Sequence, residues 1–291
     1  MRLVLFDAQR LGVLVDRGVV DVTHVLPWPH DTDPLTAGWW RELCRQQAQV
    51  IPLIAEAAEA RMALALEDVR LLAPALNPSK IIAAAANYAS HVEEMPRIQQ
   101  RTLGRVDASQ LDFDVFLKAP SSLVGPDDRI EIPAMLAGGD VEVHHEAELV
   151  AVVGKAGRDI PEGQAMEHVC GYMVGLDMTL RSHGDRSRRK SYDTFSPVGP
   201  HFTTADAIAD PANLDISLTV NGHERQRTNT SNMLRSLPEI IAYSSAIMTL
   251  LPGDLIFTGA PPGVGPIAPG DHIVVQISGL GSMALDVVVR T

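Results

Sequence analysis

Three acidic residues stand in apolar surroundings, where a carboxylate needs a partner. Glu146 and Glu148 lie in the segment Val141 to Val153, which is rich in branched apolar residues, is bounded by Gly139 and Gly154, and predicts a β-strand. Alternate side chains of a strand share a face, so the two glutamates point the same way, with Cα atoms roughly 6–7 Å apart. A hard divalent cation would resolve the repulsion between them. The alternative is a strand end with one wet face that carries two solvated glutamates.

Asp177 is the single acid of the apolar run Gly171 to Thr179, which predicts another strand. A charge in such a run is normally neutralised by a partner, and a place beside Glu146 and Glu148 as a third carboxylate ligand would neutralise it. Arg181 is the alternative partner, but four residues along a strand span roughly 13 Å, which disfavours local pairing. Together the three acids predict a site for a divalent metal ion.

His91 and Glu94 follow the apolar strand predicted for Lys80 to Ala86. If Ser90 opens a helical turn, the two side chains stand at positions i and i+3 and face the same side. This arrangement suits a general base whose imidazole is held by a carboxylate. The alternative is a solvated surface pair.

A basic run from Arg181 to Lys190 is the one cluster of positive charge in an acidic chain. Such a run is usually a solvated loop. Here it could also hold an anionic substrate or stabilise an oxyanion.

Composition limits the class of protein. The 291 residues carry 24 Lys plus Arg against 36 Asp plus Glu, a formal net charge of −12, which argues against a nucleic-acid or anionic-membrane surface. The sequence predicts neither a signal peptide nor a membrane span, so we expect a cytoplasmic protein. Cys44 and Cys170 lack metal-ligand or redox spacing and are expected to be buried thiols. Small molecules are therefore the expected partners.

The elements that must position these residues predict an α+β protein made mostly of strands in mixed pairing. A meander over 2–22 and a helix over 39–66, kinked near Pro52, precede a Pro-rich passage over 72–79. This passage predicts a boundary between a small N-terminal α/β domain, residues 1–76, and a catalytic domain, residues 77–291. Ser236 and Glu239 predict a capping box for one helix that stops at Pro252. Strands are expected over 80–86, 115–118, 141–153, 171–179, 214–220, 255–258, 272–277 and 283–289.

Several separated motifs occur in the order found in the fumarylacetoacetate hydrolase superfamily. From about Lys80 to the C-terminus the chain resembles the acylpyruvase-like and 2-hydroxyhepta-2,4-diene-1,7-dioate isomerase-like members. Each motif is weak alone, but the ordered set is specific. The motifs are Asn87-Tyr88 with His91 and Glu94, Phe116-Leu117-Lys118, Glu146-Ala147-Glu148-Leu149, Leu176-Asp177-Met178-Thr179, Lys190-Ser191, Asn229-Thr230-Ser231, Gly253-Asp254 and Thr258-Gly259-Ala260-Pro261.

The resemblance implies a mixed β-roll fold, usually a homodimer, and a small anionic keto acid as substrate. It implies Mg²⁺ or Mn²⁺, with Ca²⁺ as a substitute in a crystal. The implied roles are metal ligation by Glu146, Glu148 and Asp177, catalysis by His91 and Glu94 on a mobile lid helix and by Lys190, and substrate contacts by Lys118, Arg181 and Thr258.

The implied reaction is hydrolytic cleavage of a C–C bond in a 1,3-diketo acid, such as an acylpyruvate or a fumarylpyruvate-like compound, through a metal-bound enolate. His91, oriented by Glu94, would take a proton from the attacking water, while Lys190 and Arg181 stabilise the oxyanion. Isomerases and decarboxylases of 2-hydroxymuconate-type diacids, and 2-keto acid decarboxylases, stay open as alternatives. So do a non-catalytic metal-dependent binding protein and a purely structural Ca²⁺ site.

Two departures from the family pattern concern the substrate. The family's Arg-Asp-x-Gln motif is replaced by the run from Arg181 to Gly184, so its substrate-binding glutamine is missing. A long segment between Met95 and Asp112 could enlarge the lid or supply a cation for a second carboxylate. The candidate cations in that segment are Arg97, Arg101 and Arg105. These features favour a diacid as substrate.

Overall fold

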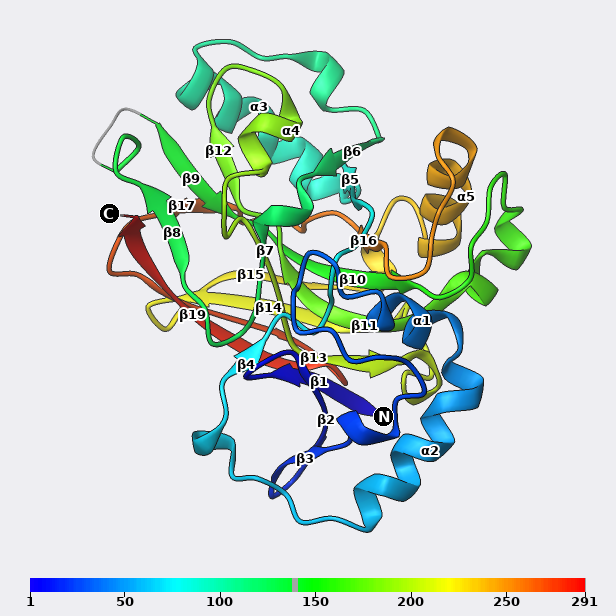
Figure 1. Cartoon of the computed structure of the whole chain (residues 1–291). Coiled ribbons are helices and arrows are strands. Elements are labelled where there is room, and N and C mark those ends of the chain that lie inside the picture. Colours follow the sequence, from blue (N-terminus) through cyan, green and yellow to red (C-terminus); the bar gives the residue numbers. More distant parts are fainter. Residues whose placement is uncertain (138–140, 291) are drawn as a thin grey trace.

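The computed structural model describes residues 1–137 and 141–290, and most of its strands form one large mixed sheet (Figure 1). Within the described residues this sheet has 11 strands in the order β3-β2-β1-β13-β11-β10-β16-β5-β6, with β4 paired to β1 and β7 to β13. The strands are β1 (Arg2–Phe6), β2 (Arg10–Val15), β3 (Gly18–Asp21), β4 (Leu71–Leu72), β5 (Ile81–Ala85), β6 (Asp114–Lys118), β7 (Leu123–Val124), β10 (Ala147–Val153), β11 (Val169–Leu176), β13 (Ser196–Thr204) and β16 (Leu255–Phe257).

Two smaller sheets accompany it. One has the order β15-β14-β18-β19-β8 and the other β12-β9-β17. Their strands are β8 (Ile130–Pro133), β9 (Glu142–His145), β12 (Thr179–Arg181), β14 (Asp215–Val220), β15 (His223–Asn229), β17 (Gly265–Ile267), β18 (His272–Ile277) and β19 (Gly281–Arg290). The α-helices are α1 (Trp39–Arg45), α2 (Gln47–Glu59), α3 (Ala89–Leu103), α4 (Arg186–Lys190) and α5 (Leu237–Ile247).

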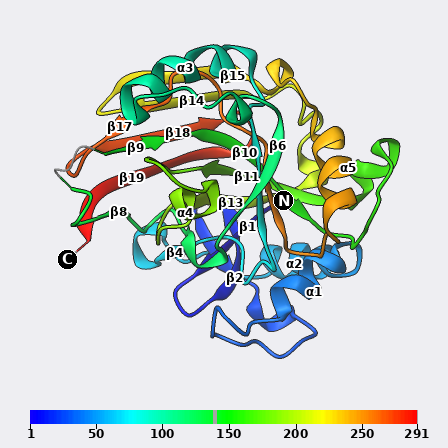
Figure 2. The same cartoon turned by 90° about the horizontal axis from the view of Figure 1, so that it is seen from above.

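Strand β10 is apolar throughout because both of its faces are buried. Leu149 and Ala151 belong to a core shared with the five-stranded sheet, which lies against β10 and β11 (Figure 2). Val150 and Val152 belong to a second core, shared with β1 and with Trp40 of α1. Central strands covered on both faces read as continuous apolar runs rather than alternating ones. The large sheet is therefore the rigid support from which the acidic residues project.

The predicted mixed, mostly β fold is confirmed, but the strand predicted over 141–153 is interrupted. It breaks at Glu146 into β9 and β10, which belong to different sheets. The strand predicted over 171–179 breaks in the same way at Asp177, between β11 and β12. The N–H of Asp177 donates to the carbonyl oxygen of Glu146 (2.9 Å), so the two breaks lie side by side. Both acids sit where the paired strands pass from one sheet to another; Gly139 lies outside the described residues.

The N-terminal segment forms the predicted meander, β1 to β3, which joins the large sheet through β13. Its helical part breaks at Gln46 rather than at Pro52, which lies inside α2, and ends at Glu59 rather than near residue 66. The backbone of Gln46 leaves the helical region (φ −117°, ψ 29°), which ends α1. The division into domains at residues 76 and 77 stays a prediction.

Helix α5 begins with the predicted capping box, in which the Ser236 and Glu239 side chains each accept from the other's backbone N–H. It ends at Ile247, earlier than predicted, because the backbone of Met248 is extended. No helix within the described residues is long and apolar enough to cross a membrane.

Candidate active site

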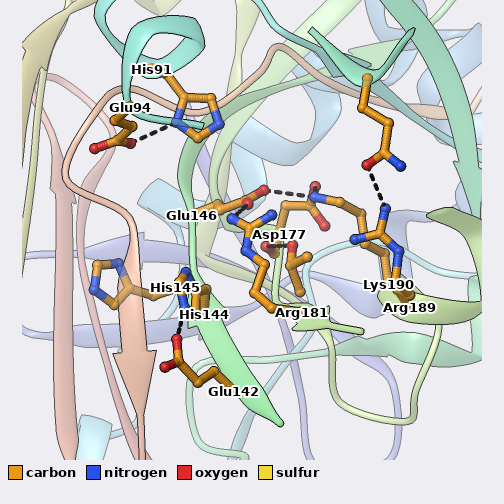
Figure 3. A network of polar contacts seen from close by, with 12 residues as sticks. His91, Glu94, Glu142, His144, His145, Glu146, Asp177, Arg181, Arg189 and Lys190 are labelled. Atoms are coloured by element: carbon orange, nitrogen blue, oxygen red, sulfur yellow. Dashed lines mark hydrogen bonds and ion pairs between the residues drawn. The ribbon is translucent and has the colours of Figure 1, made fainter. Parts of the chain in front are cut away.

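One pocket brings together side chains from several separate parts of the chain. It lies between the end of β5, the helix α3, the break between β9 and β10, and the helix α4, and it encloses a cavity of about 50 Å³. Figure 3 shows His91 and Glu94 above the carboxylates of Glu146 and Asp177, with Lys190 and Arg189 to one side. The predicted dyad, acids and basic run therefore meet in one place.

Glu146, Glu148 and Asp177 form the predicted cluster of three carboxylates. One oxygen of each lies within 4.8 Å of the others, and all three residues are buried. Glu148 projects from β10, while Glu146 and Asp177 occupy the two breaks between strands. Glu146 and Asp177 lie outside the strand ladders, and their side chains converge with that of Glu148.

The charges around the three carboxylates are uneven. Lys190 Nζ donates to Glu146 Oε2 (2.6 Å) and also to Asp177 Oδ2, and an Arg181 guanidinium nitrogen donates to Glu146 Oε1 (2.5 Å). Burial acts to raise the pKa of Glu146, but the charges of Lys190 and Arg181 outweigh it and hold that pKa well below its usual value. Burial, and after it the charge of Asp177, raises the pKa of Glu148 well above its usual value.

The donor set fits a hard divalent cation. Within the described residues Glu148 has no cationic side chain in ion-pair contact, and its one hydrogen bond comes from the backbone N–H of Gly259 (2.7 Å). A buried carboxylate without a counter-charge is costly, and a bound divalent ion would provide that charge. The three carboxylate oxygens are also the ligand type that Mg²⁺ and Mn²⁺ prefer.

Gly259 is required at this point of the loop after β16. Its φ is +98°, and a Cβ there would come within 2.7 Å of the Asn87 Cβ. The Asn87 amide donates to the carbonyl oxygens of Thr258 (2.7 Å) and Arg235 (3.0 Å), and it accepts from the Arg235 N–H (2.7 Å). Asn87 thus fixes the start of α3 against the loop that contacts Glu148.

His91 and Glu94 make the predicted contact on α3. His91 Nδ1 lies 2.8 Å from Glu94 Oε1, and His91 is 8% exposed and lines the pocket. Both Glu94 oxygens also accept from the backbone N–H of Gly263 (3.1 and 3.0 Å). Because a carboxylate can only accept, Nδ1 carries a proton, and in the neutral ring Nε2 is the nitrogen that can take one up.

Two predicted substrate contacts are engaged elsewhere in this structure. Lys118 Nζ donates to Asp177 Oδ1 (2.5 Å) and to the Phe195 carbonyl oxygen (2.7 Å), and its side chain is completely buried. The Thr258 hydroxyl donates to the Leu149 carbonyl oxygen (3.0 Å). Neither residue lines the pocket, and their contacts with a substrate stay predictions.

The basic run is partly buried and partly helical rather than a solvated loop. Arg181, Arg189 and Lys190 are buried, and all three line the pocket together with Arg186. The short helix α4 begins at the N-cap Asp185, whose side chain accepts from the Ser187 N–H (2.7 Å). The basic run was predicted from the sequence, but nothing in the sequence distinguished Arg186 and Arg189 from the other cations of the run.

Gln110 also lines the pocket and was not recognised in the sequence. It belongs to the segment between Met95 and Asp112, whose arginines were suggested instead as a source of positive charge. Within the described residues, Arg97, Arg101 and Arg105 are exposed and do not line the pocket. The reason is that α3 extends to Leu103 and places Arg97 and Arg101 on its solvent side, where Arg101 pairs with Glu142, while Arg105 follows the end of the helix.

Comparisons with known proteins agree with this site. The sequence model of the fumarylacetoacetate (FAA) hydrolase C-terminal family matches residues 80–288. Maleylpyruvate hydrolase of Aquipseudomonas alcaligenes is 38% identical over 98% of both chains. The crystal structure of maleylpyruvate hydrolase from Sphingobium sp. SYK-6, in complex with manganese(II) and pyruvate, is 38% identical and superposes with a TM-score of 0.86 over 100% of both chains.

A further relative has a different activity and a shorter alignment. The mitochondrial oxaloacetate decarboxylase of Dictyostelium discoideum is 42% identical over 72% of this chain and 94% of its own length. Relatives with different activities thus share most of this chain. On the family match and these identities, the chain belongs to the fumarylacetoacetate hydrolase family.

Proposed function

We propose that this protein is a metal-dependent hydrolase that cleaves the C–C bond of an acylpyruvate to give pyruvate and a carboxylic acid. The observation that carries the proposal is the convergence of a cluster of three buried carboxylates and a His–Glu dyad at one pocket, which is lined by Glu146, Glu148 and His91. The end-to-end similarity to maleylpyruvate hydrolase supports it, because the manganese(II) and pyruvate of the Sphingobium structure correspond to a metal and a product of this reaction.

Glu146, Glu148 and Asp177 would hold the metal ion, which we take to be Mn²⁺ with Mg²⁺ as a substitute. When bound, a divalent ion polarises the oxygens of a keto acid and stabilises the negative charge that builds up on cleavage. The Gly259 backbone N–H donates to the Glu148 carboxylate, and the Lys118 ammonium group donates to the Asp177 carboxylate. The protein therefore orients each of the three carboxylates through a second contact.

His91 is the general base of the proposed reaction. Its Nε2 takes a proton from a water molecule, whose oxygen forms a bond to the acyl carbonyl carbon. Glu94 holds the Nδ1–H and stabilises the positive charge that the ring gains. The Gly263 N–H anchors Glu94 in turn, so that the ring is held between α3 and the loop after β16.

Lys190 and Arg181 are placed to stabilise the oxyanion formed by water addition. Both line the pocket, and both donate to Glu146. The bond between the acyl carbon and the pyruvate methylene carbon then breaks, and its electron pair takes up a proton at that methylene carbon. One water is consumed, and pyruvate and the second acid are released.

Helix α3 is proposed to act as a lid. The cavity of about 50 Å³ is small for a keto acid, and α3 covers it with His91, Val92 and Met95. The helix is held down by the Glu94–Gly263 contact and by the exposed Arg101–Glu142 pair, each of which is weak enough to open. Closure over a bound substrate would exclude bulk water.

Decarboxylation of a keto acid is the second candidate, because a relative with that activity is 42% identical over 72% of this chain. The two reactions differ in whether water is delivered to the substrate. The extent of the similarity favours the hydrolase, since the alignment with the decarboxylase covers 72% of this chain and that with maleylpyruvate hydrolase covers 98%. We further propose a homodimer and a cytoplasmic location.

Turnover of a substrate panel tests the proposal. Acylpyruvates and oxaloacetate are incubated with the Mn²⁺-loaded protein or with EDTA, and pyruvate, the second acid and carbon dioxide are each measured. We expect Mn²⁺-dependent pyruvate and an equal amount of the second acid from acylpyruvates, without carbon dioxide. His91→Ala should lose turnover yet bind Mn²⁺ normally in calorimetry, while the exposed His24→Ala is the matched control. Carbon dioxide from oxaloacetate, with no cleavage of any acylpyruvate, would instead establish the decarboxylase.

A further inference from the structure

Two arginines of the pocket differ from its other cations in what they contact. Lys118, Lys190 and Arg181 each form an ion pair with a carboxylate of the metal cluster. Within the described residues Arg186 and Arg189 have no carboxylate within ion-pair distance. Their guanidinium groups donate only to neutral oxygens, although both line the same pocket as the carboxylates.

The neutral acceptors come mainly from one residue. An Arg186 guanidinium nitrogen donates to the Gln110 carbonyl oxygen (2.9 Å), and an Arg189 guanidinium nitrogen donates to Gln110 Oε1 (3.2 Å). Arg189 Nε donates to the Gly184 carbonyl oxygen (3.2 Å). These contacts are of ordinary length, so a carboxylate, which accepts charge-assisted hydrogen bonds, would compete well for the same donors.

The two guanidinium groups are at least partly buried, and Arg189 also lies near the positive charges of Arg181 and Arg186. Arg189 is 4% exposed and Arg186 is half-buried. Burial lowers the pKa of both, and the neighbouring charges of Arg181 and Arg186 lower that of Arg189 further. Arg181 Nε is buried and has no hydrogen-bond partner among the described residues. A buried guanidinium that is in direct contact with no carboxylate is costly, and an anion bound between Arg186 and Arg189 would lower that cost.

Spacing on α4 lets the two arginines act together. They stand at positions i and i+3 of this short helix, so their side chains leave it on one face. Lys190, the next residue, contacts Glu146 and Asp177. A ligand that spans the cavity from the carboxylate cluster would therefore meet Lys190 first and Arg186 and Arg189 beyond it.

We propose that Arg186 and Arg189 bind a second carboxylate of the substrate, so that the preferred acylpyruvate is a diacid. This inference rests on the proposed function and deepens it. In this structure the Arg186 and Arg189 guanidinium groups donate to Gln110, and in the complex they would donate to the substrate carboxylate instead. Because Gln110 follows the lid helix α3 in the chain, exchange of its contacts for those of the substrate links recognition of the distal acid to the position of the lid segment.

The test compares one acylpyruvate skeleton in two forms, with its distal acid free or as the methyl ester, using Mn²⁺-loaded wild type and variants. We expect Arg186→Met and Arg189→Met each to lower kcat/KM for the diacid by about 10- to 100-fold, mostly through KM, and to change that for the ester by less than about threefold. Arg188→Met is the matched control, because Arg188 is an exposed residue of the same helix. Arg189→Lys, which keeps the charge in a buried position, guards against failure of Arg189→Met to fold.

A binding measurement separates this inference from the proposed function. Calorimetry with maleate, a four-carbon diacid, on the metal-free protein should show binding by wild type and Arg188→Met and weaker binding by Arg186→Met. Equal losses for diacid and ester, or a wild type that does not prefer the diacid, would overturn the subsite. If no acylpyruvate is cleaved, the proposed function fails, and maleate binding that depends on Arg186 would still support the subsite. Maleate binding that is unchanged in Arg186→Met would refute it.

Discussion

Replacing Glu94 by Gln tests the dyad with little change of shape. The carboxylate accepts from His91 Nδ1 at 2.8 Å and from the Gly263 N–H at 3.0 and 3.1 Å. A glutamine keeps one accepting oxygen, so it cannot serve both donors with the same strength. It also removes the charge that stabilises the imidazolium formed when His91 takes up a proton.

The size of the effect follows from the 2.8 Å contact. Coulomb's law at that distance gives about 6 kcal/mol at an effective dielectric constant of about 20 and about 1.5 kcal/mol in water. The Glu94 side chain is 26% exposed, so its field is partly screened. A value of about 3 kcal/mol, between these limits, corresponds to a loss of about 100-fold in kcat.

The assay is steady-state release of pyruvate from an acylpyruvate with saturating Mn²⁺. Glu94→Gln should lower kcat while KM and Mn²⁺ affinity stay close to those of wild type. Glu93→Gln makes the same chemical change at the exposed neighbouring residue and should be silent. A kcat of Glu94→Gln within threefold of wild type would refute the argument, because the ring would then need no carboxylate.

Three further predictions concern the metal, the pH and the fold. Glu148→Gln should weaken Mn²⁺ binding in calorimetry by at least about 100-fold. The metal-free variant should be as stable to urea as wild type or more so, because the substitution removes a buried carboxyl group that forms no ion pair among the described residues. Unchanged Mn²⁺ affinity would exclude Glu148 as a ligand. Burial, and after it the charge of Arg2, lowers the pKa of His201 to about 4, so this residue stabilises the fold fully above pH 6.5 and loses that effect as the pH falls toward 4. Between pH 7.5 and pH 5 wild type should therefore lose about 2 kcal/mol of unfolding free energy that His201→Gln does not lose, and equal losses in urea titrations would contradict this. Ser236→Ala removes the N-cap of α5 and should cost about 1 kcal/mol of unfolding free energy without changing kcat; a change below about 0.3 kcal/mol would mean that the cap is not needed.

The sequence predicted well those features that depend on neighbours along the chain. The i, i+3 spacing of His91 and Glu94, the capping box at Ser236 and the apolar run of β10 are local patterns, and each recurs in the structure. The three acids were grouped correctly because a buried carboxylate always needs a partner. The need for a partner determines which residues must meet, but it does not specify the backbone path that brings them together.

The breaks at Glu146 and Asp177 could not be read locally, because leaving a sheet depends on the partners of a strand. Residues on either side of Glu146 have the composition of one strand, yet β9 pairs with β12 and β17 while β10 pairs with β11 and β16. Pairing of the cations is non-local in the same way. Four of the five positive side chains in and behind the pocket come from 181–190. Only their contacts with residues 35 to 79 positions away in the chain show which of them have carboxylate partners and which have amide oxygens. Since an arginine beside a carboxylate is already neutralised and one beside an amide is not, this difference turns an undivided basic run into two sets of residues with different chemistry.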